Sequence, residues 1–213
     1  MTSQMIHPYE FIFVKKQVAN LVNAYRSVND SSIIQTLQGL TRENVEMVLN
    51  DESQFSHIID QFMDQKLTKT NAEKILNELK EFVIPFKQPS EKQLIKSFKK
   101  VKKFKQPNWP EYDLRDFNYF GWNDKGTQRK YMVLYHNEQL VGFSGILSPN
   151  THKGACAICN EISNVSLFLT TTKFSGDGTY TKKGNYICHD SVRCNQQMSD
   201  LKFLTNFINI INH

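Results

Sequence analysis

The chain has 213 residues, of which 39% are hydrophobic and 12% aromatic, so we expect a folded protein with one large core or two small ones. No basic leader precedes the first apolar residues, and no window approaches 18 uninterrupted apolar residues. Neither a secretory signal nor a membrane-spanning helix is therefore expected, and a cytoplasmic protein is the default expectation.

The formal net charge of +5 is unevenly distributed along the chain. Residues 1–83 carry 8 Lys and Arg against 11 Asp and Glu, a net charge of −3, whereas residues 84–213 carry 18 against 10, a net charge of +8. This asymmetry indicates a basic half that meets an acidic partner, either nucleic acid or an acidic protein surface.

The first 84 residues predict four helices with short polar links, forming an antiparallel bundle. The first helix runs from Pro8 to about Val28, the third begins near Glu52, and a capping box of Thr70 and Glu73 opens the fourth. The second helix is expected to be interrupted near Gly39. Its predicted inner face consists of Ile33, Leu37, Leu40, Val45, Val48 and Leu49.

Pro85 and Pro89 end this region, so we predict a bundle domain over residues 1–84 and an α/β domain over residues 85–213. A helix then begins near Ser90 and becomes strongly basic. Its lysines are Lys96, Lys99, Lys100, Lys102, Lys103 and Lys105, and its predicted apolar side is Ile95, Phe98 and Val101. The lysines form either a solvated helix face or a docking surface for phosphates or carboxylates.

After Pro110 the pattern predicts strands. Residues 130–135 and 140–147 form a hairpin that turns at 136–139, residues 165–169 form a strand, and residues 179–188 form a second hairpin that turns at 183–185. The aromatic residues of segment 116–122 either fill a sheet core or stack on bases.

A last helix begins near Ser199 and carries two apolar stripes. One stripe holds Leu201, Leu204, Ile208 and Ile211, and the other holds Phe203, Phe207 and Ile210. The second stripe is either a partner surface or part of a broad buried face.

The four cysteines of the chain are Cys156, Cys159, Cys188 and Cys194. Their spacing is C-x2-C, a gap of 28 residues, and C-x5-C. Two such pairs can close a tetrahedral set of four sulfurs around one Zn²⁺, which leaves no open position and makes the metal structural. A knuckle, a hairpin and a helix capped by Asp190 follow the order of a treble-clef zinc finger.

Other interpretations of the cysteines are two disulfides, four unrelated buried thiols or a thioredoxin-like redox pair. A reducing cytosol disfavours the disulfides, and the β-rich sequence after Cys159 disfavours the redox pair. His152 and His189 could replace a cysteine as ligand. A zinc enzyme such as a nucleobase deaminase is disfavoured because four cysteine ligands leave no site for water. No phosphate-binding G-x-x-x-x-G-K-[ST] loop is present.

Four segments around the cysteines, 154–160, 163–168, 182–188 and 190–195, resemble the C-terminal signature of the FusB-type fusidic-acid-resistance proteins, also described as elongation factor G-binding proteins. The resemblance extends to segments 99–103, 111–114, 121–123 and 129–131, and so covers essentially the whole chain. It implies an α+β protein with an N-terminal four-helix bundle and a C-terminal α/β domain built on a four-cysteine zinc finger.

The resemblance also implies a function without catalysis. Such proteins bind the C-terminal domains of elongation factor G and promote its release from ribosomes on which fusidic acid has trapped it. Partner contacts are expected from Lys183, Tyr186 and Phe207, with Phe203 beside them on the last helix, while Ala155 stands where relatives carry an aromatic residue. A monomer is expected. The alternative function is a zinc-finger protein that binds RNA or the ribosome through the lysine-rich helix.

Overall fold

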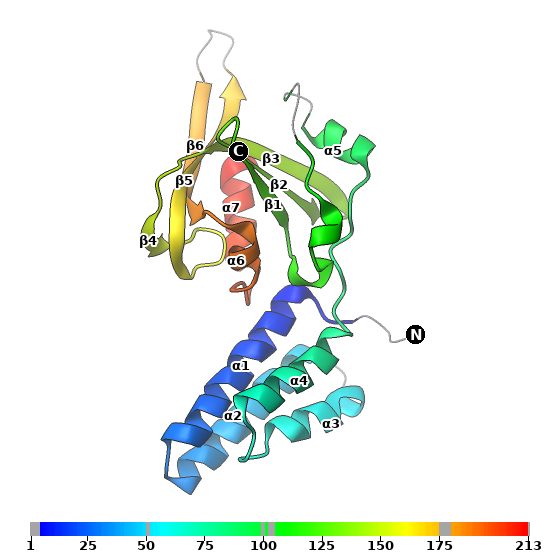
Figure 1. The fold of residues 1–213 in the computed structure, drawn as a ribbon, viewed down its shortest axis with the longest axis vertical. Helices are drawn as coiled ribbons and strands as arrows, with labels where there is room; N and C mark the ends of the chain where they lie inside the picture. The colour runs from blue at the N-terminus through cyan, green and yellow to red at the C-terminus, as the bar shows by residue number, and fades with distance from the viewer. Residues whose placement is uncertain (1–4, 50–51, 99–100, 102–104, 175–179, 213) are drawn as a thin grey trace. The chain divides into compact units, whose positions relative to one another are not determined.

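The computed structural model describes residues 5–49, 52–98, 101, 105–174 and 180–212 (Figure 1). The chain divides into two compact units, residues 1–84 and residues 85–213. Among the described residues, no helix combines the length and the hydropathy that crossing a membrane requires.

Four helices build unit 1 around one hydrophobic core. They are α1 (Pro8–Ser27), α2 (Ser31–Leu49), α3 (Glu52–Phe62) and α4 (Lys69–Lys80). Helix α1 contacts α2 and α4, and α3 contacts the same two helices. Val14, Phe55, Phe62 and Leu79 are fully buried between them. The helical N-terminal half predicted from the sequence is thus confirmed.

Three details of the predicted helices are wrong. Helix α2 continues through Gly39, and the inward side of its first half is shifted by one residue: Ile34 is buried, whereas Ile33 and Leu40 are about half exposed. In its second half, Val45 and Leu49 are buried as predicted. Apolar residues occur on both sides of this helix, so their spacing alone does not fix which side faces the core. The cap of α4 is Thr68, whose hydroxyl accepts a hydrogen bond from the Asn71 backbone at 3.2 Å, because the helix begins one residue before Thr70.

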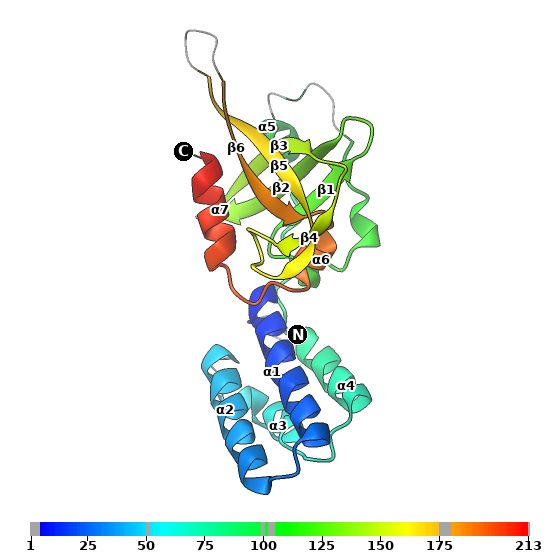
Figure 2. The same ribbon diagram turned by 90° about the vertical axis from the view of Figure 1, so that its left-hand side faces the viewer.

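Unit 2 is built on a six-stranded antiparallel sheet in the order β1-β2-β3-β5-β4, with β6 paired to β5 (Figures 1 and 2). The strands are β1 (Phe120–Asp124), β2 (Arg129–His136), β3 (Gln139–Leu147), β4 (His152–Ala155), β5 (Ile162–Phe174) and β6 (Tyr180–Cys188). The helices are α5 (Glu91–Ser97), α6 (Ser191–Asn195) and α7 (Lys202–Asn212), with short 3₁₀ turns at Trp109–Glu111 and Leu114–Asp116.

Strand β2 is buried on both faces, because successive side chains of a strand point to opposite sides. Tyr131 and Val133 join an aromatic cluster with α5 and the 3₁₀ turns. Met132 and Leu134 join a second cluster that contains the four cysteines and the inner side of α7. Of the two interpretations of the aromatic segment, the sheet core holds for Phe120, which is fully buried.

The hairpin predicted within residues 179–188 is wrong, because β6 runs without a turn from Tyr180 to Cys188 beside β5. Gly184 lies opposite Leu169, and a Cβ atom on it would overlap the Phe168 carbonyl oxygen. The glycine therefore allows close approach of two strands, a use of glycine that the sequence pattern does not distinguish from a turn.

The predicted lysine-rich helix is shorter than expected. Helix α5 begins with a capping box of Ser90 and Gln93 and ends at Ser97. Lys96 is in this helix, and Ile95, expected on its apolar side, is 54% exposed. Four lysines of the predicted basic surface lie outside the described residues: Lys99, Lys100, Lys102 and Lys103. Lys105 is described; it lies after the end of the helix and is exposed.

Candidate metal centre and partner surface

The first cysteine pair lies in a tight turn between β4 and β5, residues 156–160, which is called the knuckle below. Asn160 ends the turn with φ of +58°, and its backbone N–H donates to the Cys156 carbonyl at 2.9 Å. The backbone N–H groups of Ile158 and Cys188 donate to Cys156 Sγ at 3.3 and 3.2 Å. Donors aimed at one sulfur stabilise it as a thiolate, which is the form that binds metal.

The second pair is delivered by the end of β6 and by α6. Cys188 is the last residue of β6, and Asp190 caps α6 by accepting a hydrogen bond from the Val192 backbone at 2.8 Å. This confirms the predicted cap, which turns the chain so that Cys194 on α6 faces the other three sulfurs.

The four Sγ atoms lie within 4.8 Å of one another, and all four cysteines are buried. Cys156 Sγ is 3.8 Å from Cys194 Sγ, and Cys159 Sγ is 3.8 Å from Cys188 Sγ. Sulfurs about 2.3 Å from a tetrahedral zinc are about 3.8 Å apart, whereas a disulfide needs about 2.05 Å. The donor set fits zinc, and these distances contradict the disulfide interpretation.

The charge of the cluster also favours a cation. Contact with Cys159 lowers the pKa of Cys156, while contact with Cys156 raises the pKa of Cys194 well above its ordinary value. Without a metal, the sulfurs therefore share protons instead of carrying four negative charges. Zinc would replace those protons, and Cys156, Cys159, Cys188 and Cys194 would hold it, so that the metal links the knuckle, β6 and α6.

Lys130 is a residue of the site that sequence reasoning missed. Its side chain is fully buried, and its Nζ donates to the His189 carbonyl at 2.9 Å and to Asn123 Oδ1 at 3.0 Å. Burial lowers the pKa of Lys130 to about 8, and the nearby charges of Cys194 and Asp190 oppose that shift. A buried cation beside four thiolates compensates their charge.

Three further side chains support the cysteines. Gln197 directs its Nε2 toward Cys159 Sγ at 3.5 Å. Burial raises the pKa of Tyr119 well above its usual value, and the neighbouring Cys194 adds to the shift, so the phenol stays protonated. Asn195 is fully buried and holds α6 to the chain before β1: its Oδ1 accepts from the Asn118 N–H at 2.8 Å. No spacing signal in the sequence marks these residues.

Neither histidine near the cysteines joins the cluster. His189 shares a hydrogen bond with Ser166 Oγ through Nδ1 at 2.9 Å, and the His152 ring packs edge-on against Tyr186 with 4.6 Å between ring centroids. A zinc deaminase also needs an H-x-E element, and the chain contains one such triplet, residues 136–138. It spans the end of β2 and the turn to β3, and it contributes no ligand to the cysteine cluster. The arrangement that a zinc deaminase requires is therefore not found among the described residues.

We predict that Lys130→Met accelerates zinc loss, because the thiolates lose their buried counter-charge. Changes around metal ligands typically cost 10–100-fold in affinity, and we expect an effect of about tenfold on the zinc dissociation constant. Transfer of zinc to a coloured chelator measures this. Lys125→Met, in the exposed turn between β1 and β2, is the matched control. Equal zinc affinity in both variants would contradict the role given to Lys130.

The residues predicted to contact a partner do not form one patch. Tyr186 is 43% exposed and lies in register with Leu167, whereas Lys183 lies in register with Thr170, so strand alternation points the two side chains to opposite faces of β6. Tyr186 is also fixed at its backbone, where its carbonyl accepts a hydrogen bond from the Ala157 N–H of the knuckle at 2.9 Å.

Helix α7 exposes only one of the two phenylalanines that were predicted to contact a partner. Phe203 is 36% exposed and Ile210 is 50% exposed. Phe207 is only 3% exposed and packs on Phe168 of β5, with 6.1 Å between ring centroids. The expected direct contact of Phe207 with a partner does not fit this burial. The two stripes are separated by about 100°, so the buried face of the helix includes members of both.

Comparison with protein families matches both halves of the chain. Residues 5–87 match the model "Elongation factor G-binding protein, N-terminal", and residues 92–206 match the model "FBP C-terminal treble-clef zinc-finger". A solved structure described as that of the fusidic acid resistance protein FusC is 41% identical, covers 98% of each chain and superposes with a TM-score of 0.92. No match was found among curated proteins. The chain therefore belongs to the family of elongation factor G-binding proteins.

Proposed function

We propose that this protein binds elongation factor G and promotes its release from ribosomes on which fusidic acid has trapped it. Resistance would then arise by protection of the target, with no chemical change to the drug. The two family matches and the likeness to a fusidic acid resistance protein support this proposal. The activity is binding rather than catalysis, and it takes place in the cytoplasm with the protein as a monomer.

Residues 85–213 are the domain proposed to hold the partner site, stabilised by one structural zinc. The observation that carries the proposal is the placement of Tyr186, a large aromatic residue that is 43% exposed two residues before a zinc ligand. The knuckle N–H and the His152 ring hold it in place. An aromatic anchor that is already ordered loses little conformational entropy on binding, which favours affinity.

Phe203 and Lys183 complete the proposed surface in different ways. Phe203 adds an exposed apolar contact on α7. Lys183 lies on the face of β6 opposite to Tyr186 and contributes positive charge, which speeds association with an acidic surface more than it adds affinity. The partner would therefore contact β6 from both sides of the strand.

Calorimetric titration with purified elongation factor G tests the site. We expect Tyr186→Ala to weaken binding by at least about tenfold, since truncation of an interface anchor typically costs about 2 kcal/mol or more. Met47→Ala removes a side chain of α2 that is 66% exposed, and it should leave affinity unchanged. Equal affinity of the wild type and Tyr186→Ala would remove Tyr186 from the site.

The release step needs a separate measurement. Ribosomes loaded with elongation factor G and fusidic acid are sedimented with and without the protein, and the factor left on the ribosomes is quantified. The proposal predicts less bound factor with the wild type and little change with Tyr186→Ala. If the protein binds elongation factor G but does not reduce the amount left on the ribosomes, the proposed partner is supported and the proposed release mechanism is contradicted.

A further inference from the structure

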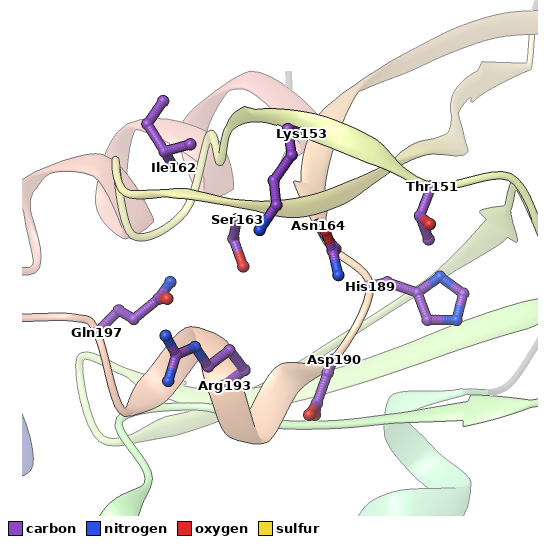
Figure 3. A pocket seen from close by; sticks show the side chains of 9 residues that line it. All are labelled: Thr151, Lys153, Ile162, Ser163, Asn164, His189, Asp190, Arg193 and Gln197. Carbon is purple, nitrogen blue, oxygen red and sulfur yellow. The ribbon is translucent and has the colours of Figure 1, made fainter.

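A pocket of about 410 Å³ lies between the β4–β5 segment and α6, beside the cysteine cluster (Figure 3). Its volume is in the range of small-molecule binding sites. Eight of its nine lining residues are polar or charged, and they come from both sides: Lys153 and Ser163 from the sheet, for example, and Arg193 and Gln197 from the α6 side. None of the residues expected to contact the partner lines it.

Two cationic side chains reach into this pocket from opposite walls. The Lys153 side chain extends from β4 and the Arg193 guanidinium from α6, toward the space between the two elements (Figure 3). Within the described ranges, neither takes part in a salt bridge. Asp190 is also in the lining, but its carboxylate caps α6 at 2.8 Å and is directed away from Lys153.

Neutral donors lie between the two cations. Ser163 is 7% exposed, and its hydroxyl points into the pocket without a hydrogen-bond partner among the described residues. The Asn164 amide faces the same space. A hydroxyl without a protein partner that lines a pocket can donate a hydrogen bond to an oxygen of a ligand.

We propose that this pocket binds a phosphate group carried by a nucleotide unit. One carboxylate would be satisfied by the Arg193 fork alone, whereas the several oxygens of a phosphate can also engage Lys153 and Ser163. The pocket of about 410 Å³ is larger than a phosphate, which leaves room beside the phosphate for a ribose or a base.

The net charge of +8 on residues 84–213 raises the local concentration of any phosphate ligand. The phosphate can come from a free nucleotide or from the backbone of an RNA strand, and both sources supply the same chemistry to Lys153 and Arg193. No lysine of segment 96–105 is among the residues that line this pocket, and the proposal does not depend on binding to elongation factor G.

The test follows the backbone amide NMR signals of Ser163, Asn164 and Arg193 in the zinc-loaded full chain. The protein is titrated with inorganic phosphate, with adenosine monophosphate and with a six-residue uridine RNA. We expect all three to shift these signals, and the Lys153→Gln/Arg193→Gln pair to raise each dissociation constant by at least about tenfold. Arg193→Lys, which keeps the charge but loses the fork, should give an intermediate loss.

The salt dependence separates the two sources. If RNA is the source, the RNA binds more tightly than the mononucleotide, and the double variant lowers the slope of log affinity against log salt by up to about two. If a free nucleotide is the source, the RNA binds no more tightly than the mononucleotide. Either result supports a phosphate site.

The matched control is Lys125→Gln/Lys182→Gln, which removes the same charge from exposed positions outside the pocket. It should leave the titrations unchanged, and zinc content checks that each variant is folded. The proposal is overturned if phosphate ligands leave the pocket signals of the wild type unmoved. It is also overturned if both double variants lose affinity equally, or if an oligoglutamate peptide shifts these signals and phosphate does not.

Discussion

Removal of zinc by a strong chelator is expected to unfold the cysteine-bearing part of unit 2. Binding of a structural zinc contributes on the order of 10 kcal/mol in small zinc domains. The four cysteines share one core cluster with Met198, Phe207 and Ile187, so loss of the metal also loosens α7 and the neighbouring strands. Calorimetry of the chelated chain should show the melting transition of unit 2 lowered by more than about 10 °C or lost.

Unit 1 is the internal control for this experiment, because it contains no cysteine and has its own core. Its helical signal in circular dichroism should persist in the chelated chain. Cys194→Ser should reproduce the effect of the chelator and show no further response to it. An unchanged melting curve in material shown by elemental analysis to lack zinc would contradict a stabilising metal.

Phe207→Ala is predicted to have a large cost in stability, although the sequence places Phe207 at the partner surface. Its ring is 3% exposed and packs against Phe168, which is fully buried. Truncation of a buried phenylalanine costs about 3–5 kcal/mol, because the removed contacts leave a cavity. Urea unfolding followed by circular dichroism measures the change in the free energy of unfolding.

Phe203→Ala is the matched control, since it makes the same chemical change at a position of the same helix that is 36% exposed. It should alter the free energy of unfolding by no more than about 1 kcal/mol while weakening binding to elongation factor G. Equal stability of the two variants would show that Phe207 is not a core residue and would return it to the partner surface.

The metal centre could be predicted because its signal is local. The spacing of the cysteines and the capping residue Asp190 determine how two short segments turn, and the structure brings the four sulfurs together as expected. The hairpin of β2 and β3 could be predicted for the same reason. Its turn residues Asn137 and Glu138 adopt positive φ, in a short polar segment between two apolar runs.

The support around the metal could not be predicted, because it depends on contacts between distant parts of the chain. A lysine within a strand usually indicates a solvent-facing position, yet Lys130 is buried. The carbonyl that it contacts, that of His189, lies 59 residues later in the sequence. The same limit explains Gly184, whose role depends on the approach of β5, and Phe207, whose burial depends on Phe168. Periodicity identifies an apolar face but not its neighbour.

The hydrogen bond from the knuckle to the Tyr186 carbonyl has a consequence for the fate of the protein in the cell. Within the described strands, β6 pairs only with β5, so the knuckle covers backbone groups that would otherwise be open to another chain. Exposed strand edges promote aggregation. A molecule that loses its zinc is therefore expected to aggregate or to be degraded, so that cellular zinc supply would limit how much active protein accumulates.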